Sequence, residues 1–180
     1  MILNTARLTI RPTRASDWKA MRVIWNDFNA SPYAGYDTPH DTRVLSLRPR
    51  IALWAKANAS GNNAHLFYAV CLEGQMIGFV NLNAREKGHE LSYGFTAASQ
   101  GHGYAREAIS AILDHCRSLG LTHFTAGTAL ANLPSVRLLT SLGFTMTGTE
   151  QVSFFTDDDG KPIWFEGGIF ELCPDPHGPK

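Results

Sequence analysis

The sequence is poor in cysteine, has no excess charge of either sign and contains no long apolar run. Its three cysteines are odd in number and widely spaced, which argues against a disulfide framework. Sixteen Lys and Arg balance sixteen Asp and Glu, so no net field favours nucleic acid or an anionic membrane as a partner. No apolar run approaches the roughly 18–20 residues that span a bilayer, and the N-terminus lacks the uninterrupted apolar stretch of a signal peptide. We therefore expect a cytoplasmic protein that binds neither nucleic acid nor membrane.

Length and composition are those of one ordinary globular domain. The chain has 180 residues, of which 44% are hydrophobic and 18% are charged, and a chain of this size can bury a substantial core. It shows no internal repeat, low-complexity tract or domain-sized linker. We expect a single domain over residues 1–172, followed by a loose tail at 173–180 that is rich in Pro and Gly.

Predicted strands and helices alternate along the chain. The helix patterns include one over 18–28, one that has Pro49 in its first turn and runs to about Asn58, and the strongest, over 105–119, which is followed by Gly120. A short helix is expected at 134–142, and strands are expected at 6–11, 66–72, 76–82, 90–95, 121–129, 144–155 and 162–172. This order predicts an α/β fold in which helices flank a mixed central β-sheet.

A polar loop with two glycines, residues 100–105, lies between an expected strand and the strongest helix. Gly101 and Gly103 lack side chains where the backbone can pass close to a ligand, and the start of the helix offers unpaired N–H groups and the positive end of its dipole. These features suit a phosphate or pyrophosphate, although a tight strand-to-helix turn would use two glycines equally well. A Walker loop is excluded because the segment has no Lys. A dinucleotide fingerprint is excluded because Arg106 stands where its third glycine belongs.

These residues and several others resemble the motifs of the GNAT acetyltransferase superfamily. Residues 100–105 fit its acetyl-CoA loop, Gln/Arg-x-x-Gly-x-Gly/Ala. A second signature, Asn-x-x-Ser followed by a Leu-rich turn and Gly-Phe, matches Asn132, Ser135 and residues 138–144. The branch related to the ribosomal-protein N-terminal acetyltransferases is similar at 7–12, 159–161 and 164–166. The likeness covers about residues 6–172, and the order and spacing of the motifs make it specific.

The resemblance implies a GNAT fold, an N-acetyltransferase activity and acetyl-CoA as co-substrate. In this family two central strands splay apart at a bulge, and the pantetheine arm lies in the gap and pairs with an open strand edge. The resemblance places Gly94 and Phe95 on that edge and the carboxamide of Asn132 on the pantetheine arm; a loop or cap residue before Pro134 is the alternative for Asn132. The residues expected around the pyrophosphate are Gln100, Gly101, His102, Gly103, Tyr104, Ala105 and Arg106.

Acetyl transfer to an amine needs a proton acceptor for the amine, a donor for the thioester oxygen and help for the departing thiolate. Glu90 opens the strand at 90–95, where family members often place a base; its alternative is a solvated carboxylate at a strand end. Many family members have a tyrosine acid at the position of Leu139, so this chain lacks that candidate. Ser135 matches the serine of the ribosomal-protein branch and can donate a hydrogen bond to the thiolate; its alternative is a helix-start serine that bonds to backbone groups.

The sequence does not identify the acceptor, which can be a protein N-terminus or a small-molecule amine. Tyr33 and Tyr36 lie in an irregular loop after a helix and are the candidate acceptor-binding residues. The histidines show no metal-ligand spacing, and His115 and Cys116 are helix neighbours that point about 100° apart, so we expect no metal and a buried, inert Cys116. The chain can be a monomer or a homodimer. A CoA-binding sensor or structural module without catalysis is the alternative from another class, and the missing tyrosine at Leu139 keeps it open.

Overall fold

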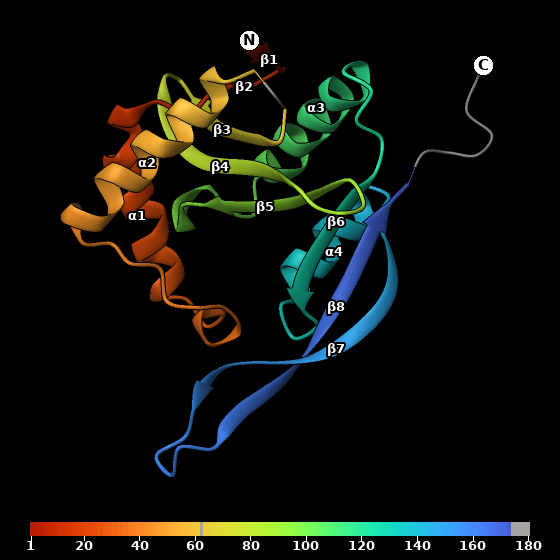
Figure 1. Cartoon of the computed structure of the whole chain (residues 1–180). Helices are drawn as coiled ribbons and strands as arrows, with labels where there is room; N and C mark the ends of the chain where they lie inside the picture. Colours follow the sequence, from red (N-terminus) through yellow and green to blue (C-terminus); the bar gives the residue numbers. More distant parts are fainter. Residues whose placement is uncertain (62, 174–180) are drawn as a thin grey trace.

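The computed structural model describes residues 1–61 and 63–173, which form one sheet with helices on both of its faces (Figure 1). The helices are α1 (Trp18–Asn29), α2 (Val44–Ala59), α3 (Tyr104–Ser118) and α4 (Leu133–Ser141), with short 3-10 turns at Ala15–Asp17, Ala34–Tyr36 and Ala97–Ser99. The strands are β1 (Leu3–Asn4), β2 (Leu8–Pro12), β3 (His65–Leu72), β4 (Gln75–Ala84), β5 (His89–Phe95), β6 (Phe124–Ala129), β7 (Thr145–Thr156) and β8 (Pro162–Leu172). They lie in the order β1-β2-β3-β4-β5-β6-β8-β7, and only β5 and β6 are parallel neighbours. The sheet is therefore mixed, as the sequence predicted.

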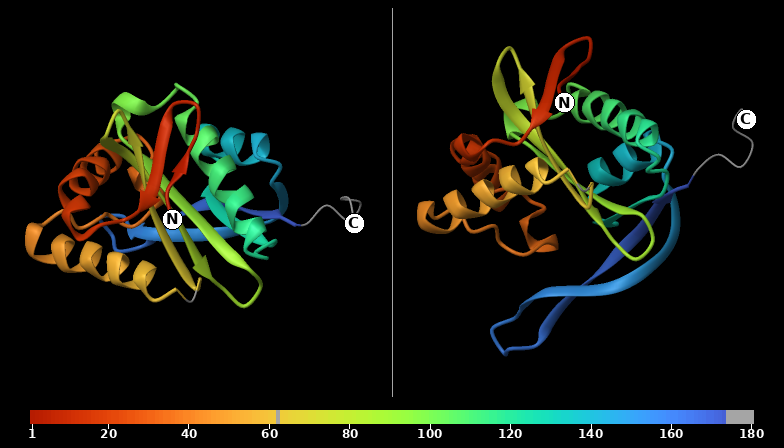
Figure 2. Two further views of the ribbon diagram at one scale, coloured as in Figure 1. Left: turned by 90° about the horizontal axis from the view of Figure 1, so that it is seen from above. Right: turned by 45° about the horizontal axis from the view of Figure 1, so that its top comes forward.

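Each face of the sheet is covered by one pair of helices (Figure 2). Side chains on a strand alternate between faces, and β4 shows this directly, because Phe79 packs in the cluster under α1 and α2 while Val80 packs in the cluster under α3 and α4. On the first face the buried residues are Met21, Ile24, Trp25, Leu47, Ile51 and Phe79. On the second face the helices contribute Ala108, Ile109, Ile112, Leu113, Cys116 and Leu139. Cys116 is fully buried, as predicted, and burial raises the pKa of its thiol to about 11.

The two central strands separate soon after they meet. β5 and β6 share only two register pairs, His89 with Phe124 and Glu90 with Thr125. Beyond them β5 stays paired with β4 up to Phe95, and β6 stays paired with β8 up to Ala129. The facing edges of β5 and β6 therefore open into a wedge, which we call the central gap. The family resemblance implied a bulge at this point, and that expectation is wrong for β5, because its register with β4 is continuous from His89 to Phe95.

A two-stranded arm projects from one side of the sheet (Figure 1). β7 and β8 pair along most of their length, but β6 covers β8 only from Gly167 to Leu172. Residues 151–166, which we call the arm, therefore extend beyond the other strands. Its large apolar side chains Phe154, Ile163 and Trp164 are exposed.

The predicted order of elements is confirmed, with a few local differences. The short strand β1 was not expected, and α2 begins at Val44 rather than near Pro49. Pro49 lies inside α2, which continues through it because Leu47 and Ile51, one turn apart, are both fully buried against the sheet. None of the described helices is both long and apolar enough to cross a membrane. The tail expected at 173–180 lies outside the described residues from position 174 onward.

Candidate active site

The glycine loop between β5 and α3 forms a set of unpaired backbone donors. Gly101 and Gly103 both have φ of +78°, a conformation that residues with a side chain rarely adopt. The N–H groups of residues 101–106 donate to no group in the described part of the chain; the first helical bond is made by Glu107, whose N–H donates to the carbonyl of Gly103 at 3.1 Å. These N–H groups stand at the N-terminus of α3, where the helix dipole is positive. The loop can therefore bind an anion such as a pyrophosphate.

The side chains of the loop hold its shape and leave its charge exposed. The Gln100 amide donates to the carbonyl of Phe95, and the His102 ring nitrogen Nδ1 lies 2.8 Å from the carbonyl of Gln100. The His102 ring stacks on Tyr104 with centroids 5.6 Å apart. The Arg106 side chain is exposed and makes no hydrogen bond or ion pair with the described residues, so its guanidinium is available to an anion on the loop.

Arg7, between β1 and β2, clamps this loop from the side. Its Nη1 donates to the carbonyl of His102 at 3.0 Å, its Nε donates to Glu107 Oε2 at 2.7 Å, and its guanidinium lies 4.5 Å from the centroid of the Tyr104 ring. The hydrogen bond from the Thr5 hydroxyl lowers the pKa of Glu107 below its ordinary value, and each contact with Arg7 lowers it further by a smaller amount. The N-terminal segment thus fixes the start of α3. Sequence reasoning noted Arg7 only as part of a family motif, because its partners lie about a hundred residues away in the chain.

Asn132 caps α4, and its neighbour Ser135 faces the sheet. The Asn132 side-chain oxygen accepts the N–H of Ser135 at 3.3 Å. Asn132 is therefore a helix cap through this oxygen, which was the alternative expected for it. The Asn132 amide nitrogen donates to no described residue and remains available to a ligand. The Ser135 hydroxyl bonds to no backbone group among the described residues; it lies 2.8 Å from the hydroxyl of Tyr93, within hydrogen-bond distance.

Tyr93 is a candidate site residue that the sequence analysis did not single out. Burial raises the pKa of its phenol to about 12, so it remains a neutral proton donor at every physiological pH. It lies on β5 beyond the last residue that pairs with β6, and its hydroxyl meets Ser135 in the first turn of α4, on the face of the sheet that α3 and α4 cover. Leu139, where many family members have a tyrosine, is fully buried in the core. Alternation along β5 could have revealed Tyr93, since it shares a face with Leu91 and Phe95 toward α3 and α4.

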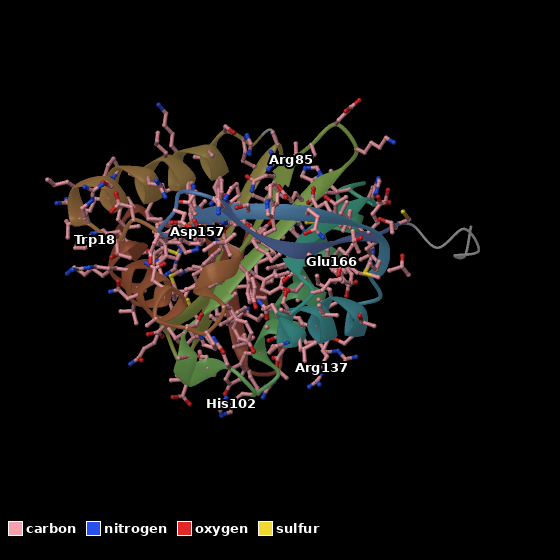
Figure 3. The ribbon with its side chains drawn as sticks, turned by 90° about the horizontal axis from the view of Figure 1, so that it is seen from below. Trp18, Arg85, His102, Arg137, Asp157 and Glu166 are labelled. Carbon is pink, nitrogen blue, oxygen red and sulfur yellow. The ribbon has the colours of Figure 1, made fainter. Side chains whose placement is uncertain are left out.

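Glu90 lies where the central gap closes, on the opposite face of β5 from Tyr93. Its carboxylate forms an ion pair with Arg85, whose Nε donates to Glu90 Oε2 at 2.8 Å, while Oε1 has no partner among the described residues. The side chain is 39% exposed. Figure 3 shows Arg85 and His102 at opposite ends of the molecule, so an extended ligand on the loop would have to reach along the gap to approach Glu90.

The remaining predicted residues lie on β5 and in the segment between α1 and α2. Gly94 packs so closely on Phe79 that a Cβ would lie 2.7 Å from its ring, and Phe95 lies over Gly78. Gly94 and Gly78 must therefore both be glycine, because a larger side chain would collide with these rings. Tyr36 contacts Phe165 of the arm, with ring centroids 5.2 Å apart. Tyr33 lies in the turn that precedes Ala34–Tyr36 and is half-buried.

Comparison with known proteins shows the family. The model of the acetyltransferase (GNAT) domain matches residues 7–145. The uncharacterized N-acetyltransferase YnaD of Bacillus subtilis is 27% identical over 156 residues, which is 82% of this chain and 85% of that protein.

Solved structures share the fold. An acetyltransferase of Salmonella typhimurium that modifies the N-terminal serine of the ribosomal protein L7/L12 superposes with a TM-score of 0.81 at 17% identity, covering 97% of this chain and 100% of that one. The putative acetyltransferase yncA of the same organism, solved with acetyl-CoA, gives 0.73 at 24% identity, covering 97% and 98%. With a glycine loop of free amide donors beside two separating strands, and a family match over most of its length, this chain belongs to the GNAT N-acetyltransferases.

Proposed function

We propose that this protein binds acetyl-CoA in the central gap and transfers the acetyl group directly to a primary amine in a ternary complex. The observation that carries the proposal is the row of unpaired N–H groups at 101–106, which adjoins the strand edge that β5 leaves open. The loop suits the pyrophosphate, with Gln100, Gly101, His102, Gly103, Tyr104, Ala105 and Arg106 around it. The acetyl-CoA complex of a structural neighbour with the same fold supports this choice of co-substrate.

The pantetheine arm would run from the loop into the gap. Its amides would pair with the free edge of β5 near Gly94 and Phe95, as an added strand does. The free amide nitrogen of Asn132 would donate to one of its carbonyl groups. This path brings the sulfur toward the level of Tyr93 and Ser135, the polar pair that joins β5 to α4.

The chemistry needs an amine base and a donor for the thiolate. Glu90 would accept the amine proton through Oε1, directly or through water, since Arg85 occupies Oε2. Backbone N–H groups on the open edge of β5 would stabilise the thioester oxygen as it becomes negative. Ser135 would donate a hydrogen bond to the departing thiolate, and Tyr93 would orient and polarise that hydroxyl. No covalent enzyme intermediate is required, because holding both reactants supplies much of the barrier reduction.

The acceptor would enter from the side of Tyr33, Tyr36 and the arm. The contact between Tyr36 and Phe165 joins the early loop to the arm and gives this side an aromatic wall. A protein N-terminus or a small primary amine fits such an entrance, and a structural neighbour acts on an N-terminal serine.

The test is CoA release from acetyl-CoA, measured with a panel of amines: peptides with N-terminal Ser, Ala or Met, polyamines, amino acids and aminoglycosides. Acetylation of at least one amine above the rate of acetyl-CoA hydrolysis, confirmed by mass spectrometry, is the expected result. Tight acetyl-CoA binding by calorimetry without turnover on any amine would support a non-catalytic CoA-binding module instead. Failure to bind acetyl-CoA would refute the proposal as a whole.

A further inference from the structure

A group of metal-ligating side chains lies at the closed end of the central gap, apart from the residues assigned above. His123 stands just before β6, and Glu171 and Cys173 stand at the end of β8. One ligand atom from each residue lies within 4.8 Å of the other two. We propose that these residues bind a single Zn²⁺ ion.

The strand register brings the three residues together. β6 and β8 are antiparallel, with Phe124 opposite Leu172 and Thr125 opposite Glu171. Continuing this register by one residue sets His123 opposite Cys173, and Glu171 lies on the same side of β8 two residues earlier. Phe124 and Leu172 face the core under α3 and α4, so the three ligands share the opposite face. Cross-strand neighbours have Cβ atoms about 4.5–5.5 Å apart, a spacing that lets their side chains converge on one ion.

The distance between His123 and Glu171 suits ligands of a common ion. Nε2 of His123 lies 3.5 Å from Oε2 of Glu171, longer than the usual N–H···O hydrogen bond of about 2.9 Å. Two ligands at about 2.0–2.1 Å from a tetrahedral Zn²⁺ are roughly 3.3 Å apart. In addition, Nε2 is buried and has no hydrogen-bond partner among the residues that the structure describes. A ring nitrogen shielded from water in this way is costly without a partner, and a metal ion would supply one.

The donor set and the local backbone favour zinc. One thiolate, one imidazole and one carboxylate match the borderline-soft preference of Zn²⁺, with a fourth position left for water. The backbone of His123 is held in place, because its carbonyl accepts the N–H of His89 at 3.0 Å. Gly88 also packs so closely that a Cβ there would lie 2.3 Å from this carbonyl. The exposed thiol of Cys173 is accessible to the ion.

The site lies outside the open part of the gap, so we assign it no step in acetyl transfer. It would tie the end of β8 to the start of β6, next to the register pairs His89–Phe124 and Glu90–Thr125 that close the gap. The sequence analysis did not predict this site, because His123 and Cys173 come from distant segments and show no metal-ligand spacing. The proposal is independent of acetyl transfer and its test requires no acetyl-CoA.

The experiment uses the full chain, reduced and freed of metal with a chelator. Titration with Co²⁺ should reach one equivalent and produce a thiolate-to-cobalt charge-transfer band in the near ultraviolet, and Zn²⁺ should displace it. His123→Gln and Cys173→Ser should each weaken Zn²⁺ binding at least about 100-fold, since even partners that only orient a ligand contribute roughly 10–100-fold. Zn²⁺ should raise the Tm of the wild type and not of these variants.

His65→Gln is the matched control, because His65 is an exposed histidine on β3, three strands away from β6, where it contacts Asn83 and Phe67. It should bind Zn²⁺ like the wild type. The metal-free Tm of each variant shows whether it folds. Wild-type affinity in Cys173→Ser or His123→Gln, or no saturable binding at about 100 μM metal, would overturn the proposal and leave a simple His123–Glu171 ion pair.

Discussion

Replacing Ser135 with Ala tests whether the Tyr93–Ser135 pair acts on the departing thiolate. The substitution removes one hydroxyl and leaves the α4 cap intact, because Asn132 binds the backbone N–H of residue 135 rather than its side chain. A hydrogen bond to a charged group contributes about 1.5–3 kcal/mol. At about 1.4 kcal/mol per tenfold, kcat should fall roughly 10- to 150-fold. Since this interaction is made only in the transition state, kcat/KM should fall equally and the Kd of acetyl-CoA should stay unchanged.

Stability and rate separate the roles of the two hydroxyls. Ser135→Ala leaves the Tyr93 hydroxyl without its partner, at a cost of about 1–3 kcal/mol for an unsatisfied buried group. Tyr93→Phe removes that hydroxyl and leaves the Ser135 hydroxyl without its partner, but Ser135 is only half-buried, so water can replace the lost bond and the cost in stability should be smaller. If Tyr93 acts through Ser135, Tyr93→Phe should lower kcat less than Ser135→Ala does, and the double variant should be no slower than Ser135→Ala alone. Because the pKa of Tyr93 is about 12, its effect should be constant between about pH 6.5 and pH 9.

The assay measures turnover, acetyl-CoA affinity and Tm on the same preparations. Ser141→Ala is the control, because its hydroxyl also lies on α4 but, within the described part of the chain, bonds only to the carbonyl of Leu138 on the exposed side. It should leave kcat unchanged. Normal turnover in a less stable Ser135→Ala protein would refute the catalytic role and leave the pair as a structural contact between β5 and α4. A double variant that multiplies the two single losses would show that Tyr93 acts on the reaction independently.

Four further predictions concern the loop, the base and the contacts of Arg7 with α3. Gly103→Val should weaken acetyl-CoA binding tenfold or more, about 1.4 kcal/mol, because φ is +78° there; calorimetry on a folded variant with unchanged affinity would remove the loop from the site. Glu90→Gln should keep acetyl-CoA affinity and lower kcat roughly 100-fold, most of all at low pH, and a kcat within about twofold at every pH would exclude Glu90 as the base. Arg7→Ala should raise the Kd for acetyl-CoA with little change in kcat, and Arg7→Lys should restore part of the affinity. The pKa of Glu107 is lowered in the folded state, so its contribution to stability is present above its ordinary pKa of 4.5 and is lost as the pH falls through the folded value. The acid limb of a Tm–pH profile should therefore shift in Glu107→Gln. An unchanged acid limb would contradict a stabilising contact between Arg7 and Glu107.

The sequence by itself determined the order of the elements and the place of the loop. Strand and helix periodicities depend on neighbouring residues, so they are readable locally, as is the need for glycine at positions 101 and 103. The same locality explains the error at Pro49. A proline in a helix is a local penalty, and the burial of Leu47 and Ile51 that outweighs it depends on the sheet beneath.

The tertiary structure alone decided which distant side chains meet. Arg7 reaches His102 and Glu107, Tyr93 reaches Ser135, and His123 reaches Glu171, each across a long separation in the chain. Such contacts depend on strand order and register, and a shift of one residue in register would turn every side chain of a strand to the other face. The central gap has the same origin, because it exists only where β5 follows β4 while β6 follows β8. The loop could therefore be identified from neighbouring residues alone. The Tyr93–Ser135 pair beside the gap and the His123, Glu171 and Cys173 cluster at its closed end depend on how the strands pair.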